Sequence, residues 1–132
     1  MSKHRVFVYG SLRRGNAGAM SVRFPDAAHV GDGKVRGRLY DLGAYPALLL
    51  DESGAQVTGE VYEVTDETLN KLDQFELTSD YERRDVEVEI GDEHGHCWIY
   101  VPAHEASFFD GFPTIESGDW IKHLRARQAG SL

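Results

Sequence analysis

Glu76 is the residue best placed for acid–base chemistry in this 132-residue chain. It ends a segment that Thr65 can cap as a helix. Leu69 and Leu72 share one face of this helix with Phe75 or Glu76, which puts Glu76 on or near the inward side. A carboxylate at the inward end of a helix loses part of its hydration. This raises its pKa towards neutral pH and suits it to act as a general base. The alternative is a helix-end glutamate in a surface salt bridge, and the helix pattern leaves both interpretations open.

The second candidate is the loop Tyr9-Gly10-Ser11-Leu12, which follows a short apolar strand predicted over residues 6–8. Consecutive backbone N–H groups in such a turn can bind an anion or stabilise an oxyanion. Gly10 would let a ligand approach the backbone closely, and Ser11 adds a hydroxyl. An ordinary turn is the alternative. Ser11 is disfavoured as a nucleophile, because the second glycine of a nucleophile elbow is absent and no histidine can be assigned as its base.

Metal centres and a catalytic thiol are both disfavoured by the sequence. His94 and His96 have no obvious third ligand, and His104-Glu105 lacks the histidine that would complete a zinc-protease motif. Cys97 alternates with apolar residues in a predicted strand, which favours a buried core thiol. As the one cysteine of the chain, Cys97 cannot form an intrachain disulfide.

Charge and hydropathy exclude several classes of partner. The chain has 14 Lys and Arg against 22 Asp and Glu, and this net charge of −8 disfavours binding to nucleic acid. The basic pair Arg13-Arg14 is expected either to be solvated in a loop or to attract an anionic ligand to the mouth of a site. No apolar run is long enough for a signal peptide core or a membrane span. We therefore expect a cytoplasmic protein with no membrane partner.

The elements that must position these residues are mostly short strands. Strands are predicted over residues 6–8, 30–42, 48–50, 57–64, 81–90 and 97–101, and helices over 17–24 and 66–76 and from residue 120. Glycines at 31, 33 and 37 suit bulges or tight bends in a curved sheet, and residues 51–54 suit a hairpin turn. The pattern predicts an α+β fold in one domain over residues 1–132, with a small mixed sheet or barrel and peripheral helices.

Seven segments, in order along the chain, carry a family resemblance. They are VFVYGSLRRGN at 6–16, YDLGAYPA at 40–47, GEVYEV at 59–64, LDQFE at 72–76, YER at 81–83, WIYV at 98–101 and SGDW at 117–120. No single segment is specific, but their order and spacing together resemble the γ-glutamylcyclotransferase-like family, including γ-glutamylamine cyclotransferases and AIG2-like proteins.

The resemblance implies a small mixed β-barrel with flanking helices and a cavity at its mouth. It also implies a reaction without metal or cofactor, in which the α-amine of a small-molecule γ-glutamyl substrate attacks its own γ-carbonyl. The products are 5-oxoproline and a free amine or amino acid. Glu76 matches the acid–base glutamate of the family, and Tyr9, Gly10, Ser11 and Leu12 match its substrate-binding loop. Tyr81 and Tyr100 match aromatic positions that line the cavity.

Two alternatives to this cyclotransferase keep the same fold. One is a non-catalytic module that binds small molecules, and the other is an enzyme that removes a γ-glutamyl protecting group from a natural product. The sequence does not identify the leaving group, whose pocket is expected from residues 43–47 and 103–113, nor the oligomeric state. Three aromatic residues in the second segment, Phe108, Phe109 and Phe112, are expected to form a lid, a core plug or an interface.

Overall fold

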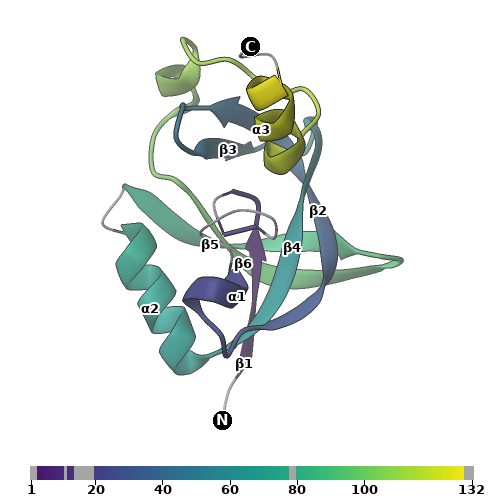
Figure 1. The fold of residues 1–132 in the computed structure, drawn as a ribbon, viewed down its shortest axis with the longest axis vertical. Coiled ribbons are helices and arrows are strands. Elements are labelled where there is room, and N and C mark those ends of the chain that lie inside the picture. The colour runs from purple at the N-terminus through teal and green to yellow at the C-terminus, as the bar shows by residue number, and fades with distance from the viewer. Residues whose placement is uncertain (1–2, 11, 14–19, 78–79, 130–132) are drawn as a thin grey trace.

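The computed structural model describes residues 3–10, 12–13, 20–77 and 80–129 (Figure 1). Its elements, in chain order, are β1 (Lys3–Val8), α1 (Met20–Arg23), β2 (Ala28–Asp41), β3 (Pro46–Leu50), β4 (Ala55–Thr65), α2 (Asp66–Leu77), β5 (Tyr81–Ile90), β6 (Glu93–Pro102), the 3-10 turn η1 (Ala106–Phe109) and α3 (Trp120–Ala129). Each strand and helix predicted from the sequence has a counterpart among the described residues; of the helix predicted over 17–24, residues 17–19 lie outside them.

Five strands close into a mixed barrel in the order β2-β4-β1-β6-β5, which confirms the predicted α+β class. The pairing of β2 with β5, at Gly33 with Ile90 and Lys34 with Glu89, closes the ring. The pair β1–β6 is parallel and the other pairs are antiparallel. The sixth strand, β3, pairs with the end of β2 that extends beyond the barrel, beside α3 (Figure 1). No helix in the described ranges is long and apolar enough to cross a membrane.

Strand β1 is buried on both faces, so its sequence is apolar throughout its second half. Phe7 packs inside the barrel in a cluster that includes Ile99, while Val6 and Val8 belong to a second cluster with Leu72 of α2. Because successive side chains of a strand point to opposite faces, this division places α2 on the outside of the barrel wall. The helix runs along one side of the barrel in Figure 1.

The glycines of β2 serve close packing as well as the predicted bending. The strand register shifts between His29 and Gly31, which is the irregularity expected from a bulge. At Gly33, a Cβ atom would lie only 2.9 Å from Val88 Cγ1 and 3.2 Å from the ring of Phe7. A side chain at Gly33 would therefore displace the aromatic ring that fills the barrel interior.

The prediction of a hairpin at residues 51–54 is wrong. Strands β3 and β4 lie on opposite sides of β2 and do not pair with each other. The connecting segment turns through a hydrogen bond from Gly54 N to Asp51 O of 2.8 Å and crosses β2 at Gly37. A Cβ at Gly54 would lie 2.6 Å from Gly37 O, so the two backbones approach too closely at the crossing for a side chain at Gly54. The alternating pattern of β4 gave no information about which strand it would join.

Helix α2 begins as the sequence predicts. The Thr65 hydroxyl accepts a hydrogen bond of 3.3 Å from Thr68 N, which satisfies one of the free amides at the helix start. Leu69 and Leu72 are buried against the barrel. The helical repeat then brings Glu76, seven residues after Leu69, to the same face.

Arg13 is buried and structural, which contradicts both interpretations made from the sequence. Its Nε donates to Glu60 of β4 at 2.8 Å, and its Nη1 donates to Asp119 at 2.6 Å. Asp119 also accepts a hydrogen bond of 3.1 Å from Lys122 N at the start of α3. The Arg13 side chain thus ties the loop after β1 to the barrel wall and to the C-terminal helix. Arg14 lies outside the described residues.

We predict that Arg13→Met lowers the free energy of unfolding by about 3–5 kcal/mol, because it removes the cation from buried ion pairs with Glu60 and Asp119. Urea denaturation of both proteins measures this difference. The matched control is Arg38→Met, since Arg38 forms an exposed pair with Asp51 at 3.7 Å. That variant should change the free energy by less than about 1 kcal/mol. Equal, small changes in both variants would contradict a structural role for the Arg13 ion pairs.

Candidate functional site

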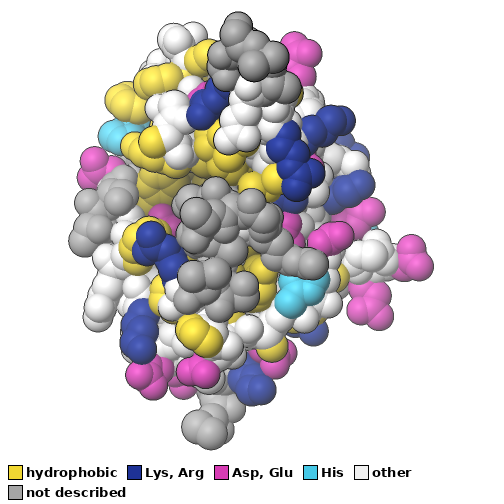
Figure 2. All heavy atoms as spheres, viewed as in Figure 1, with side chains coloured by type: hydrophobic (Ala, Val, Ile, Leu, Met, Phe, Trp, Pro, Cys, Tyr) yellow, Lys and Arg dark blue, Asp and Glu magenta, His cyan; other side chains and the backbone are white. Residues whose placement is uncertain are grey.

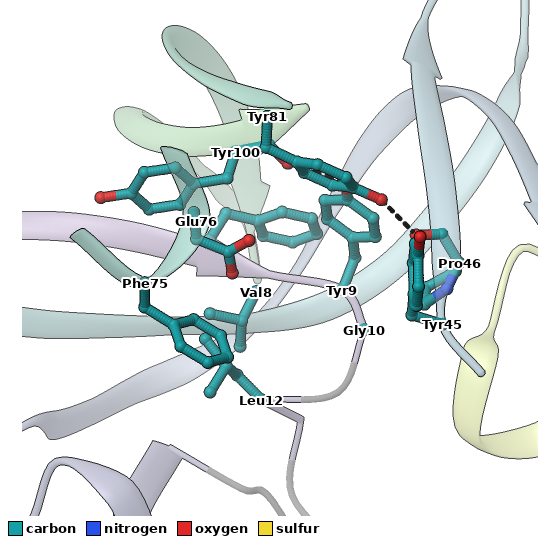
Figure 3. A pocket seen from close by; sticks show the side chains of 11 residues that line it. Val8, Tyr9, Gly10, Leu12, Tyr45, Pro46, Phe75, Glu76, Tyr81 and Tyr100 are labelled. Carbon is teal, nitrogen blue, oxygen red and sulfur yellow. Dashed lines mark hydrogen bonds between the residues drawn. The ribbon is translucent and has the colours of Figure 1, made fainter. Parts of the chain in front are cut away.

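A cavity of about 190 Å³ opens where the end of β1, the start of β3, the end of α2 and the strands β5 and β6 meet (Figure 3). Its lining residues are Phe7, Val8, Tyr9, Gly10, Leu12, Tyr45, Pro46, Phe75, Glu76, Tyr81 and Tyr100. The volume is many times the ~10–15 Å³ that a single water needs on the same measure. A small organic molecule therefore fits, in surroundings that are mainly aromatic and aliphatic.

Glu76 is the one carboxylate among these lining residues, and its side chain points into the cavity in Figure 3. Burial raises its pKa from 4.5 to about 7, and the positive charge of Arg23 opposes that rise. No described side chain donates a hydrogen bond to the Glu76 carboxylate. A carboxyl group with this pKa is present in both protonation states near neutral pH, so it can accept a proton and return it.

The three tyrosines line the cavity with their rings while their hydroxyls bind protein groups. Tyr9 donates to Tyr100 O at 2.7 Å, Tyr81 donates to Pro46 O at 3.0 Å, and Tyr100 donates to Asp73 Oδ1 at 2.7 Å. Burial is the largest cause that raises the pKa of each of the three phenols. All three therefore stay neutral at physiological pH, and Glu76 is the lining residue that carries a charge.

The loop after β1 is held in a turn and pressed against β3. Arg13 N donates to Gly10 O at 3.0 Å, and the Leu12 side chain is buried at the cavity wall. A Cβ at Gly10 would lie 2.9 Å from Pro46 Cγ. Gly10 is thus required by the approach of Pro46, a reason that the sequence did not reveal.

The structure brings six of the seven predicted site residues to one cavity: Tyr9, Gly10, Leu12, Glu76, Tyr81 and Tyr100. Ser11 lies outside the described residues. The catalytic and binding roles of the seven residues stay predictions at this point.

Five further residues line the cavity. Tyr45 and Pro46 come from the loop 43–47, which was expected to recognise a leaving group, whereas Phe7, Val8 and Phe75 had no predicted role in substrate binding. The apolar pattern of β1 could not distinguish cavity wall from core. The described part of the second expected loop, 103–113, contributes none of the lining residues. In that loop Phe109 is buried against Tyr40, with ring centres 5.5 Å apart, so it is the core plug.

The residues disfavoured for chemistry lie away from the cavity. His94 and His96 are exposed and pair with Glu87 at 3.7 Å and Asp85 at 3.0 Å. Cys97 is buried in the barrel, and burial raises the pKa of its thiol to about 11, which confirms the prediction of a core thiol. Within the described ranges, no group of three or more His, Cys, Asp and Glu side chains lies close enough to hold a metal ion.

Comparison with known proteins identifies the family of this fold and cavity. Residues 6–122 match the family described as "Gamma-glutamyl cyclotransferase, AIG2-like". A putative gamma-glutamylcyclotransferase of Vibrio cholerae is 35% identical over 123 residues, covering 92% of this chain and 99% of that protein. A gamma-glutamylaminecyclotransferase of Bos taurus is 35% identical over 112 residues, covering 74% of this chain and 65% of that protein. The crystal structure of an AIG2-like protein from mouse superposes with a TM-score of 0.75, at 30% identity, over 88% of each chain.

We predict that the Glu76 carboxyl titrates near pH 7 and makes the fold less stable as pH rises. Its pKa is about 7 in the folded state and 4.5 in the unfolded chain. Between these values the folded state holds more protons, so this group's contribution to the free energy of unfolding falls with increasing pH. Urea denaturation of Glu76→Gln and of the unmodified protein at pH 5 and pH 8 measures this contribution to the free energy of unfolding. The variant should gain stability relative to the unmodified protein at pH 8, and a difference independent of pH would contradict the raised pKa.

Proposed function

The chain belongs to the gamma-glutamyl cyclotransferase, AIG2-like family, and from this premise we propose that it is a γ-glutamyl cyclotransferase. It cleaves a γ-glutamyl amine or amino acid into 5-oxoproline and the free amine. The observation that carries the proposal is the Glu76 carboxyl, which lies in a mainly apolar cavity beside the loop of Gly10 and Leu12 and has a pKa of about 7.

The proposed reaction needs a substrate held in its ring-closing conformation and one group that transfers protons. The α-nitrogen of the γ-glutamyl group attacks its own γ-carbonyl carbon, which forms the five-membered lactam. The bond to the leaving nitrogen breaks. Overall, two protons pass from the α-ammonium group to the leaving nitrogen, and neither water nor an oxidant is consumed. Because nucleophile and electrophile belong to one molecule, holding the ring-closing conformation supplies much of the acceleration.

Glu76 is the proposed acid–base residue. In its ionised form it takes a proton from the α-ammonium group, which frees the nitrogen to attack. In its protonated form it then donates that proton to the departing nitrogen. A pKa of about 7 favours both steps, since neither the loss nor the gain of the proton is strongly uphill near neutral pH.

The segment from Tyr9 to Leu12 is the proposed binding loop, as its match to the family motif implies. Its backbone N–H groups would hold the substrate carboxylate or the oxyanion that forms on the γ-carbonyl. Tyr81 and Tyr100 would enclose the aliphatic part of the γ-glutamyl group, because their rings line the cavity while their hydroxyls bind Pro46 O and Asp73. The packing of Gly10 against Pro46 supports the proposal, since it fixes the loop at the cavity wall.

We predict that Glu76→Gln lowers the rate of 5-oxoproline formation by about 10²–10⁴-fold, the usual contribution of one positioned acid–base group. The purified protein is incubated with a panel of γ-glutamyl amines and γ-glutamyl amino acids, and 5-oxoproline is measured. With the unmodified protein, kcat/KM should rise with pH through about 7 as Glu76 ionises.

The control for this experiment is Glu67→Gln, which removes an exposed carboxylate from the first turn of the same helix. It should keep the activity of the unmodified protein. Full activity of Glu76→Gln, or no 5-oxoproline from any compound, would overturn the proposal. Binding of a γ-glutamyl compound that is recovered unchanged would instead support a non-catalytic module.

A further inference from the structure

One cation lies beside the cavity and has no assigned role. The guanidinium carbon of Arg23, at the end of α1, is 4.8 Å from the centre of the Phe75 ring. Phe75 lines the cavity next to Glu76, and the Arg23 charge acts on the Glu76 carboxyl. On the face shown in Figure 2, hydrophobic side chains line a hollow and Lys or Arg side chains lie at its edge. Arg23 is therefore a positive charge at the border of a cavity whose own charged residue is negative.

Arg23 is not neutralised by the described part of the protein. It forms no ion pair with any described carboxylate, and it is exposed. By contrast, the guanidinium groups of Arg13, Arg83 and Arg127 each contact a carboxylate, on Glu60 and Asp119, on Asp73 and on Asp41 respectively. A guanidinium placed over an aromatic ring can still donate hydrogen bonds to a carboxylate, because its five N–H groups are not consumed by the contact with the ring.

The proposed reaction determines which part of a substrate would meet Arg23. The γ-glutamyl group must lie inside the cavity, between Glu76 and the loop of Gly10 and Leu12. Since Glu76 returns its proton to the leaving nitrogen, the leaving group passes Glu76 on its way to solvent. The mouth carries two exposed aromatic rings, Phe75 at 40% and Tyr45 at 48% exposure, although both line the cavity. A leaving group that passes Phe75 comes within reach of the guanidinium that lies over its ring.

Resting on the proposed function, we propose that Arg23 is a specificity-determining residue that binds a carboxylate on the leaving group. The preferred substrates are then γ-glutamyl amino acids, whose leaving group carries a carboxylate, over γ-glutamyl amines, whose leaving group has none. A hydrogen-bonded guanidinium–carboxylate pair at a partly exposed site gives a discrimination of about 3–10-fold.

The test compares γ-glutamyl-alanine with γ-glutamyl-ethylamide, whose leaving groups differ by one carboxylate and whose other product is the same 5-oxoproline. The unmodified protein should have the higher kcat/KM for γ-glutamyl-alanine. Arg23→Gln should lower that value by about 3–10-fold relative to the value for the ethylamide, and Arg23→Lys should restore part of the preference. The ratio of the two values removes any change common to both compounds, including the higher Glu76 pKa expected without the Arg23 charge.

Arg125→Gln is the matched control, since Arg125 is exposed on α3 and absent from the cavity lining. It removes the same charge from a protein with a net charge of −8, so it reports the long-range effect on an anionic substrate. This control should leave the ratio unchanged. An equal loss on both compounds in Arg23→Gln would overturn the inference, because Arg23 would then act on the shared γ-glutamyl group. An unchanged ratio in Arg23→Gln would overturn it as well.

A binding measurement separates this inference from the proposed function. Calorimetric titration of Glu76→Gln, and of Glu76→Gln combined with Arg23→Gln, measures the Kd of both compounds without turnover. Tighter binding of γ-glutamyl-alanine that is lost with Arg23 supports the inference even if no 5-oxoproline ever forms. If the unmodified protein turns over both compounds but Arg23→Gln changes neither the ratio of their kcat/KM values nor the ratio of their Kd values, the proposed function stands and the inference fails.

Discussion

The burial of β1 on both faces is the constraint on which the rest of the structure depends. Phe7 fills the barrel interior, and Val6 and Val8 face the outer cluster that includes Leu72 of α2. With both faces packed, the strand has no freedom to shift by one residue, because such a shift would exchange its two buried faces. The end of β1 is therefore fixed relative to α2. Since Gly10 and Leu12 follow β1 and Glu76 lies in the last turn of α2, the same packing fixes the two sides of the cavity.

The cavity gains its chemistry from the contrast between two carboxylates on one helix. Asp73 lies three residues before Glu76, accepts the Tyr100 hydroxyl at 2.7 Å and pairs with Arg83 at 3.3 Å. Glu76 faces the apolar cavity, where burial raises its pKa to about 7. The two carboxylates have different surroundings although they lie less than one helical turn apart on α2. Asp73 thereby serves to hold a tyrosine ring in place, while Glu76 keeps a proton that can be exchanged near neutral pH.

Charged groups outside the cavity hold its walls together. The Arg13 side chain joins the loop after β1 to Glu60 and to Asp119 at the start of α3. At the other end of α3, Arg127 donates to Asp41 and to Gly43 O, in the segment that leads into Tyr45. Helix α3 thus restrains the segments on two sides of the cavity without lining it. Arg23 differs from these two arginines, since it pairs with no carboxylate of the described residues and lies beside the cavity, over the Phe75 ring.

The sequence by itself determined the elements and the candidate residues. Local sequence patterns predict the apolar strand β1, the alternating strands β4, β5 and β6, and the capped helix with Leu69, Leu72 and Glu76 on one face. Each of these patterns lies within one short segment. The family resemblance added the roles predicted for Glu76 as the acid–base residue and for residues 9–12 as the binding loop.

Only the tertiary structure decided which elements meet. It showed that β3 and β4 pair with opposite sides of β2 instead of forming a hairpin with each other, that Arg13 is buried and that Gly10 is required by Pro46. It also placed Tyr45, Phe75 and Arg23 around the same cavity. These are contacts between residues far apart in the chain. The sequence pattern of a strand or loop indicates which of its own side chains face inward, but not which distant segment they contact. The burial, pKa and ion pairs of a side chain depend on those distant contacts, so only the tertiary structure determines them.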